Sequence, residues 1–403
     1  MPELAVLRSP AEVLFGSGMA AAAGGVAARH GHRVLAITDP VLAATEGYAA
    51  VLASLREAGL DVVEFTDAAV DVPMTTIDAA ATTGREARPD VIVAVGGGSA
   101  IDLAKVTALL LAHGGALNAY YGEHMVPGPV LPLIALPTTA GTGSEVTPVS
   151  VIGDPELGMK VGISSPYLIP RTAICDPELT RTCPPSVTAH SGIDALSHAI
   201  EAFMAVTRRP DWRLPLERVA VGKNAMSDVL ALAAVREIGV NLERAVADGD
   251  DMAARSGMLF GSLNAGLAFA NAGVAAAHAL QFAIGAATGT PHGLGTGLML
   301  PYVMAFNRPE REPALAELAA ALGAPEGDAV AIVHDLGLRI GLPARLADLE
   351  LGEDRLAAMG EQAAGITRLA GNNPRPLDAH GCTAILRAAW HGDPSLLAER
   401  AAA

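Results

Sequence analysis

The sequence predicts a chain of two parts, an α/β part built on a parallel sheet and then an all-helical part. Up to about residue 178, short apolar runs alternate with helical patterns, and this alternation is typical of a parallel sheet. Beyond that residue, long Ala- and Leu-rich helical patterns follow one another. The 403 residues also exceed the usual size of one domain, roughly 100–200 residues. We therefore expect two domains, residues 1–178 and 179–403.

The expected strands of the first part are short apolar runs bounded by turn residues. They cover residues 33–38, 61–65, 91–95 and 131–135. Helical periodicity lies between them, near residues 42–58, 75–87 and 100–111. The strongest helical patterns of the second part cover residues 186–203, 228–247 and 251–270. Two stretches rich in proline and charge, residues 208–221 and 371–378, predict loops.

Composition argues against several classes of protein. The chain has 27 basic and 43 acidic residues, and the resulting net charge of −16 opposes binding to nucleic acid or to an anionic membrane surface. No signal segment or long uninterrupted apolar stretch is visible. The cysteines are odd in number and lack CxxC spacing, which argues against disulfides and a structural zinc site: Cys175, Cys183 and Cys382. We expect a cytoplasmic protein that binds neither nucleic acid nor membrane.

A glycine run follows one of the buried strands and leads into a helix. In the segment Gly96-Gly97-Gly98-Ser99 the backbone can approach a ligand closely, and the helix N-terminus offers free N–H donors and a positive dipole end. This pattern predicts a cradle for an anion such as a phosphate. An ordinary tight turn between a strand and a helix would show the same glycines.

Two further features point to a dinucleotide. The segment 137–145 is a second loop after a strand, rich in Thr and Gly, and small enough to lie against a nicotinamide or a phosphate. Asp39 ends another apolar run, where a carboxylate can accept hydrogen bonds from a ribose and repel a 2′-phosphate, which favours NAD over NADP. A polar turn explains the loop equally, and a helix cap explains Asp39.

Four residues of the second part form a candidate metal site. Asp194 and His198 are four residues apart in a helical pattern, so their side chains project from one face. His278 and His292 lie among apolar residues that offer no charge partner. One carboxylate and three imidazoles complete a ligand set for Fe(II) or Zn(II) rather than Mg(II) or Ca(II). Each residue taken singly also fits a surface pair or a hydrogen-bonded core histidine.

With these residues the sequence resembles the iron-containing (group III) alcohol dehydrogenase family. The resemblance runs through almost the whole chain, in residues 96–105, 137–145, 154–160, 190–201 and 278–293. It implies a Rossmann-like dinucleotide-binding α/β domain followed by an all-helical domain, an architecture shared with dehydroquinate synthase. It also implies a homodimer or a larger homo-oligomer.

The resemblance also assigns roles to individual residues. The metal-ligand places fall on Asp194, His198, His278 and His292. The pyrophosphate loop corresponds to Gly97, Gly98, Ser99 and Asp102. The second cofactor loop corresponds to Thr138, Thr139, Thr142 and Ser144. Lys160 takes the place of a lysine that contacts the cofactor, and Asp39 that of the ribose-binding acid.

The activity that the resemblance implies is that of a metal-dependent oxidoreductase. The metal acts as a Lewis acid on the substrate oxygen, and a hydride moves between NAD(H) and a small alcohol or aldehyde. The sequence departs from many members at Phe282, where they carry a histidine thought to relay the alcohol proton. We expect Phe282 to narrow or dry the substrate pocket.

Two alternatives remain open on the sequence. One is a specialised reductase of the same superfamily, acting on maleylacetate, a hydroxyacid/oxoacid pair or an aldehyde that bears a phosphonate. An anionic substrate of this kind needs a cation in the pocket, for which Arg375 and Lys160 are candidates. The other is a catalytically silent nucleotide-binding subunit of an assembly.

Overall fold

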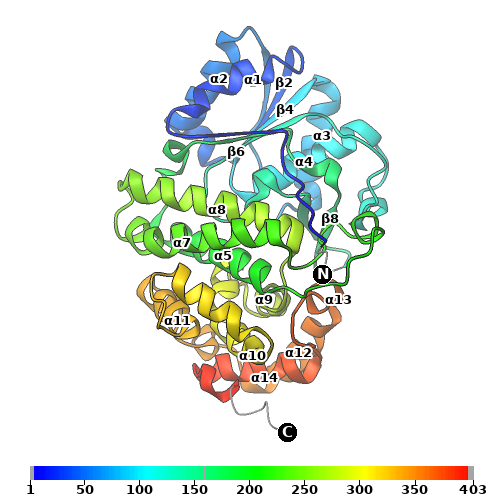
Figure 1. Ribbon diagram of the computed structural model, residues 1–403. Coiled ribbons are helices and arrows are strands. Elements are labelled where there is room, and N and C mark those ends of the chain that lie inside the picture. The colour runs from blue at the N-terminus through cyan, green and yellow to red at the C-terminus, as the bar shows by residue number, and fades with distance from the viewer. Residues whose placement is uncertain (1–3, 158, 398–403) are drawn as a thin grey trace. The chain divides into compact units, whose positions relative to one another are not determined.

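The computed structural model describes residues 4–157 and 159–397 and contains two compact units (Figure 1). The sheet unit comprises Arg8–Cys183 and the short segment Arg213–Val219. The helical unit comprises residues 4–7, 184–212 and 220–397. The sequence placed the domain boundary after residue 178, whereas these units divide after Cys183 and also exchange two short segments.

A six-stranded parallel sheet forms the core of the sheet unit. Its strands in spatial order are β1 (Glu12–Phe15), β9 (Thr172–Cys175), β6 (Leu133–Pro137), β4 (Val91–Gly96), β2 (Arg33–Ile37) and β3 (Asp61–Phe65). Every neighbouring pair in this order is parallel. The predicted α/β class is therefore confirmed, although β1 and β9 were not predicted and β6 begins two residues later than expected.

Helices cover both faces of this sheet. Alternate strand residues point to opposite sides, so both faces carry apolar side chains that need to be buried. In β2, Val34 and Ala36 join a core with α1 (Ala23–Ala27) and α2 (Glu46–Glu57). Leu35 and Ile37 join the other core, with α3 (Met74–Ala87) and α4 (Gly98–His113). The strand is therefore buried on both faces, as a continuous apolar run requires.

A small second sheet in this unit was not predicted. The strands β7 (Val149–Asp154) and β8 (Met159–Ser164) form an antiparallel pair, and β5 (Gly122–Glu123) runs parallel to β8. The main chain of Gly153 in β7 donates to the carbonyl of Asp71, at 2.8 Å, so this sheet is tied to the loop before α3.

The helical unit contains helices and no strand within its described residues, which confirms the predicted all-helical part. Its helices are α5 (Pro185–Met204), α7 (Ala225–Ala247), α8 (Met252–Ala272), α9 (Ala276–Thr288), α10 (His292–Ala321), α11 (Ala329–Arg339), α12 (Leu356–Gly365), α13 (Thr367–Ala370) and α14 (Ala379–His391). The short α6 (Leu214–Glu217) belongs to the sheet unit. The helices α5, α7 and α8 lie side by side (Figure 1).

In the described part of the chain, no single helix combines the length and hydropathy that crossing a membrane requires. The pair α8 and α9 meets the criteria only when taken together, and a bend of 102° separates the two helices. Most residues of both helices are buried within the protein.

Candidate metal centre and cofactor loops

Helix α5 presents three buried polar side chains along one face. Asp194, His198 and Glu201 are spaced four and then three residues apart, the spacing that aligns side chains on a helix. The helix begins at Pro185, a favourable first position because proline has the helical φ and its missing N–H would have no partner there. All three side chains lie in the interior of the helical unit.

A tight turn brings two histidines together from the neighbouring helices. Helix α9 ends at Thr288, and Gly289 directly after it adopts a φ of 69° that glycine tolerates best. Pro291 then precedes α10, whose first residue is His292. The ring centroids of His278 in α9 and His292 lie 5.4 Å apart as a result.

Three of the four predicted metal ligands, Asp194, His278 and His292, form one cluster in the structure, and the fourth, His198, lies next to it. Asp194 Oδ1 lies 3.8 Å from Nε2 of His278 and 3.8 Å from Nε2 of His292. Asp194 Oδ2 lies 4.0 Å from Nε2 of His198, whose ring stacks on that of His278 at 4.7 Å. Ligand atoms of Asp194, His278 and His292 all lie within 4.8 Å of one another.

The donor atoms fit a metal ion. Asp194 Oδ1 and His278 Nε2 are buried and have no hydrogen-bond partner, an arrangement that costs free energy unless something else binds them. Two ligands about 2 Å from one tetrahedral ion lie about 3.3 Å apart, close to the separations observed here. A set of imidazoles and one carboxylate suits Fe(II) or Zn(II).

Glu201 was not predicted as a site residue, yet it controls His278. Its Oε2 accepts a 2.6 Å hydrogen bond from His278 Nδ1, and the main-chain N–H groups of Ala275 and Ala277 donate to its two oxygens. A carboxylate only accepts, so Nδ1 carries the proton and Nε2 keeps a lone pair for a metal. The available signal was its place seven residues after Asp194 on the same helix face.

Burial sets the electrostatics of the site. It raises the pKa of Asp194 to about 6, against the opposing effect of the nearby His278. Burial by itself would lower the pKa of His278, but the hydrogen bond and charge of Glu201 outweigh it and the pKa is raised. The carboxylate of Asp194 therefore needs a cation beside it to be well stabilised.

Two phenylalanines lie beside the histidines. Phe269 from α8 stacks on His198 with ring centroids 4.2 Å apart. Phe282 from α9 meets His292 edge-on at 6.4 Å, next to the site for which the sequence predicted it. These rings give the site apolar walls.

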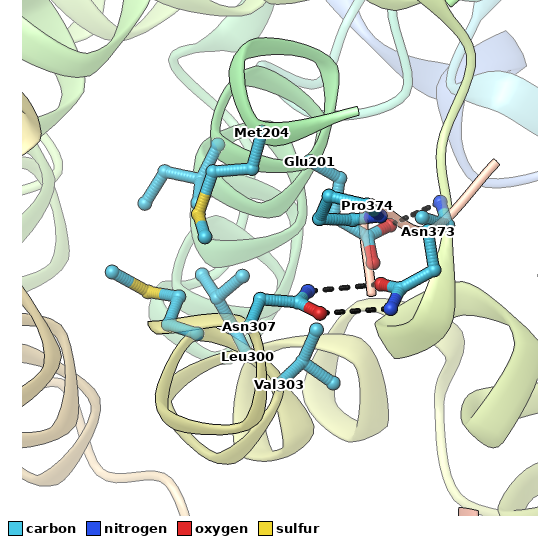
Figure 2. Close-up of a pocket in the computed structure, with 10 residues that line it drawn as sticks. Glu201, Met204, Leu300, Val303, Asn307, Asn373 and Pro374 are labelled. Carbon is cyan, nitrogen blue, oxygen red and sulfur yellow. Dashed lines mark hydrogen bonds between the residues drawn. The ribbon is translucent and has the colours of Figure 1, made fainter. Parts of the chain in front are cut away.

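A small cavity adjoins Glu201 on the side of α10. It has a volume of about 10 Å³, room for one water at most, and mostly apolar side chains line it. Figure 2 shows Asn307 and Asn373 beside it, whose amides bond each other at 2.9 and 2.8 Å. The pair joins α10 to the loop before α14. The amide oxygens of both residues accept hydrogen bonds from each other's amides.

The two predicted cofactor loops touch each other in the sheet unit. The glycine loop (residues 96–99) follows β4 and the second predicted loop (residues 137–145) follows β6, the neighbouring parallel strand. Together with residues 146 and 147, which come before β7, this second loop is called the threonine loop. The N–H of Thr138 donates to the carbonyl of Gly96 at 3.1 Å. A Cβ at Gly98 would lie 2.7 Å from Thr142 Cγ2, so only glycine allows this approach.

Asp39 lies where the strand order reverses. The chain runs outward from β2 to β3 and returns to β4 on the other side of β2, and dinucleotides bind at the carboxyl ends of strands at such a point. The carboxylate also caps the next turn, since Oδ1 accepts from the N–H groups of Val41 and Leu42, both at 2.9 Å. The helix-cap interpretation of Asp39 thus describes part of its role.

Three other predicted cofactor residues are hydrogen-bonded within the protein. Ser144 Oγ donates to Asp102 Oδ1 at 2.5 Å. Lys160 Nζ donates to Asp71 Oδ1 at 2.6 Å, in a partly exposed ion pair. Of the remaining predicted residues of the two loops, Thr138 is buried, and the half-buried ones are Gly97, Gly98, Ser99, Thr139 and Thr142. The assignment of individual cofactor contacts remains a prediction.

Both units of the chain match models of a known protein family. Residues 10–177 match the model of the family described as iron-containing alcohol dehydrogenase, and residues 217–390 match the C-terminal model of the same family. Long-chain-alcohol dehydrogenase 1 of Geobacillus thermodenitrificans (strain NG80-2) is 37% identical over 371 residues, which cover 89% of this chain and 90% of the relative.

Two solved structures are similar over nearly the whole chain. A 1,3-propanediol oxidoreductase superposes with a TM-score of 0.89 at 31% identity, covering 96% of this chain and 100% of the other. A sulfoacetaldehyde reductase of Bifidobacterium kashiwanohense, in complex with NAD+, gives a TM-score of 0.84 at 31% identity, covering 98% and 100%.

Proposed function

This chain belongs to the iron-containing alcohol dehydrogenase family, and from that premise we propose the cofactor, the ligands and the kind of substrate. It is a metal-dependent oxidoreductase that transfers a hydride between a nicotinamide cofactor and a small alcohol or aldehyde. The proposed metal is Fe(II), with Zn(II) as the alternative, and the proposed ligands are Asp194, His198, His278 and His292. The proposal depends above all on two buried atoms without partners, Asp194 Oδ1 and His278 Nε2, which lie 3.8 Å apart.

The chain's own residues prepare the reaction. A bound Fe(II) or Zn(II) supplies a Lewis acid for the alcohol or carbonyl oxygen, and bound NAD supplies the hydride acceptor. Glu201 keeps the proton of His278 on Nδ1, so that Nε2 presents its lone pair. Phe269 stacks on His198, and the His198 side chain is buried from water.

The proton of the alcohol leaves by a route that does not use residue 282. Phe282 has no ionisable group, in contrast to the histidine expected at this position in many members. We propose that solvent takes the proton on the side of His292, whose side chain is 37% exposed.

The proposed cofactor is NAD rather than NADP. The half-buried carboxylate of Asp39 lies at the carboxyl end of β2, where it would repel a 2′-phosphate. Replacing Asp39 with Gly should therefore shift the ratio of kcat/KM for NAD and NADP toward NADP, and a steady-state comparison of the two cofactors measures it. An unchanged ratio would count against a position of Asp39 at the ribose.

The proposed substrate is an uncharged alcohol or aldehyde. The apolar rings of Phe269 and Phe282 beside the ligands favour such a molecule. Arg375, one of the cations considered for an anionic substrate, lies over the ring of Phe306 at 4.2 Å and donates to its carbonyl at 2.9 Å. The alternative is an anionic aldehyde, the kind of substrate named for one of the similar structures.

Location and assembly are also proposals. We propose a cytoplasmic homodimer or larger homo-oligomer that binds neither nucleic acid nor membrane. None of the three cysteines, all of which lie in the described part of the chain, forms a disulfide, which supports the cytoplasmic location. The net charge of −16 supports the absence of binding to nucleic acid and to membrane. Sedimentation of the purified protein measures the number of subunits.

Metal analysis combined with a substrate panel tests the proposed function. Protein purified anaerobically is analysed for bound metal and then assayed by NADH oxidation against short and long aldehydes, sulfoacetaldehyde and oxoacids, after reconstitution with Fe(II) or Zn(II). One metal per chain with metal-dependent turnover of uncharged aldehydes is expected. A preference for the anionic members would favour the specialised reductase, and a metal-free inert protein would favour the silent nucleotide-binding subunit.

A further inference from the structure

A buried lysine in the sheet unit has no part in the proposed chemistry. The side chain of Lys105, in the second turn of α4, has no exposed surface. Its Nζ donates to Ser144 Oγ at 2.9 Å, to Thr147 Oγ1 at 3.2 Å and to the carbonyl of Val149 at 2.7 Å. An ammonium group has three donors, so these three acceptors use all of them.

Asp102 completes the network on the same face of α4. Its Oδ1 lies 3.7 Å from Lys105 Nζ and accepts a hydrogen bond from the hydroxyl of Ser144 at 2.5 Å. Its Oδ2 accepts from the N–H of Val151 in β7 at 2.8 Å. The hydroxyl of Ser144 therefore donates to the carboxylate and accepts from the ammonium, and its orientation is fixed.

This network joins the two cofactor loops through their side chains. Ser144 and Thr147 belong to the threonine loop, whereas Lys105 belongs to the helix that continues the glycine loop. A second contact between the loops is the close approach of Gly98 to Thr142. The polar groups of both loops can bind one dinucleotide only if the loops keep a fixed separation. The hydrogen bonds of Lys105 to Ser144 and Thr147 hold this separation.

Packing alone does not explain a lysine at this place. Burial lowers the pKa of Lys105 to about 8, with the charges of Asp102 and Glu145 acting in the opposite direction. Glu145 is buried beside it with Oε1 unpartnered, and burial raises its pKa to about 7. Burying ionisable groups costs stability that a methionine of similar volume would not cost. The network therefore contributes a defined geometry rather than stability.

We propose that Lys105 is a positioning residue for the nucleotide, which holds the threonine loop against the glycine loop without contacting the nucleotide. Asp102 and Ser144, which the resemblance implied as cofactor residues, belong to the same internal network. The inference rests on the proposed function, because it requires NAD to bind at these two loops.

NADH titration of the full-length, metal-loaded protein tests this inference through protein fluorescence. In Lys105→Met the three donors are lost while most of the side-chain volume remains. Nucleotide binding must then order the threonine loop, so the Kd for NADH should rise at least about tenfold. KM for NAD should rise with it, kcat should change much less, and bound metal should be unchanged because its ligands lie in the helical unit.

Lys223→Met is the matched control. Lys223 is a partly buried lysine of the helical unit, where Nζ donates to the carbonyl of Phe203 at 2.7 Å and pairs with Asp228 at 2.8 Å. Its replacement should lower the melting temperature without changing the Kd for NADH. A raised Kd in this control would show that any loss of a buried lysine weakens binding and would overturn the inference.

Thr147→Val keeps the test decisive if Lys105→Met folds poorly, because it removes an acceptor of Lys105 at a residue that is not a predicted cofactor contact, and it should also weaken NADH binding. Ser144→Ala tests another acceptor of Lys105. It removes the hydroxyl that joins Lys105 to Asp102 and should also weaken NADH binding. If Lys105, Asp102 and Ser144 act as one network, the double variant Lys105→Met/Ser144→Ala should bind NADH about as weakly as whichever single variant has the higher Kd. Additive effects would instead make Ser144 a direct nucleotide contact.

Unchanged NADH binding in Lys105→Met, or in Thr147→Val if Lys105→Met folds poorly, would refute the role of Lys105 and leave the proposed function intact. Failure of the unmodified protein to bind NADH would refute the proposed function itself.

Discussion

At the scale of single residues, Glu201 determines how His278 can act. The carboxylate accepts hydrogen bonds from the histidine and from two main-chain N–H groups, and the whole arrangement is buried. It therefore fixes both the orientation of the ring and the position of its proton. Groups that hold a metal-binding histidine in this way raise its basicity and hence its affinity for the metal.

Glu201→Gln should weaken metal binding while retaining most of the side-chain volume. The amide has one acceptor oxygen in place of two, so a main-chain N–H or His278 loses its partner. The affinity for the metal should fall about 10–100-fold, measured by competition with a chelator of known affinity. Glu243→Gln, at an exposed ion pair with Arg339, should leave the affinity unchanged. Equal affinities in all three proteins would contradict the role of Glu201.

At the scale of elements, the start of α10 depends on close helix contacts. A Cβ at Gly293 would lie 2.2 Å from the carbonyl oxygen of His190 and 3.0 Å from Asp194 Cβ, both in α5. Glycine at this position lets α10 approach α5, and this approach sets the distance from His292 to Asp194.

Gly293→Ala should therefore reduce stability and metal affinity together. The backbone of α5 cannot yield as a side chain would, so α10 must shift at a cost of about 1–3 kcal/mol. Urea unfolding gives the change in free energy, and chelator competition gives the affinity. Gly25→Ala is the control, because a Cβ at Gly25 in α1 meets nothing within 4 Å and should leave metal affinity unchanged. A destabilised variant with normal metal affinity would show that His292 keeps its place without this contact.

Asp90 fixes the beginning of β2 through its carboxylate. Its Oδ2 accepts from the N–H groups of His32 and Arg33, both at 2.9 Å. These bonds, with that of Arg33 the largest, lower the pKa of Asp90 to about 2 from its usual 3.8. A lowered carboxyl pKa stabilises the folded state above the usual value, and this contribution is lost as the pH falls toward 2.

Asp90→Ala should therefore destabilise the protein most above about pH 4. The difference in unfolding free energy between the two proteins should shrink when urea unfolding is repeated at pH 6, 4 and 3. The solvent exposure of this group screens the effect and keeps it small. A difference that stays constant across these pH values would rule out a contribution from the charge.

At the scale of the whole molecule, the proposed metal ligands and the proposed cofactor loops belong to different units. All four proposed ligands and Glu201 belong to the helical unit, whereas the glycine loop, the threonine loop and Asp39 belong to the sheet unit. Each proposed ligand site is therefore built within one unit.

Metal removal should therefore destabilise the helical unit selectively. A ligand that binds only the folded state stabilises it, by about 2.7 kcal/mol when its free concentration is 100 times its Kd. Hydrogen exchange with and without a chelator should show lost protection in α5, α9 and the start of α10, with the six-stranded sheet unchanged. Equal loss of protection in both units would contradict a metal site confined to the helical unit.

The sequence by itself determined the features that depend on neighbouring residues. Alternating apolar runs and helical periods predicted the parallel sheet and the helical part, since each period reflects which side of one element is buried. The spacing of Asp194 and His198 placed both on one helix face. The glycine run predicted a loop that approaches a ligand, because that property belongs to the residue type itself.

Only the tertiary structure decided which groups meet across long stretches of chain. Glu201 meets His278 over 77 residues of sequence, and Lys105 meets Ser144 over 39. The edge strand β1 pairs with β9, which is formed by residues far along the chain. Periodicity cannot identify such partners, because a buried polar group is satisfied by whatever the fold brings near it. For the same reason Asp102 and Ser144, which the resemblance placed at the cofactor, are found bonded to each other.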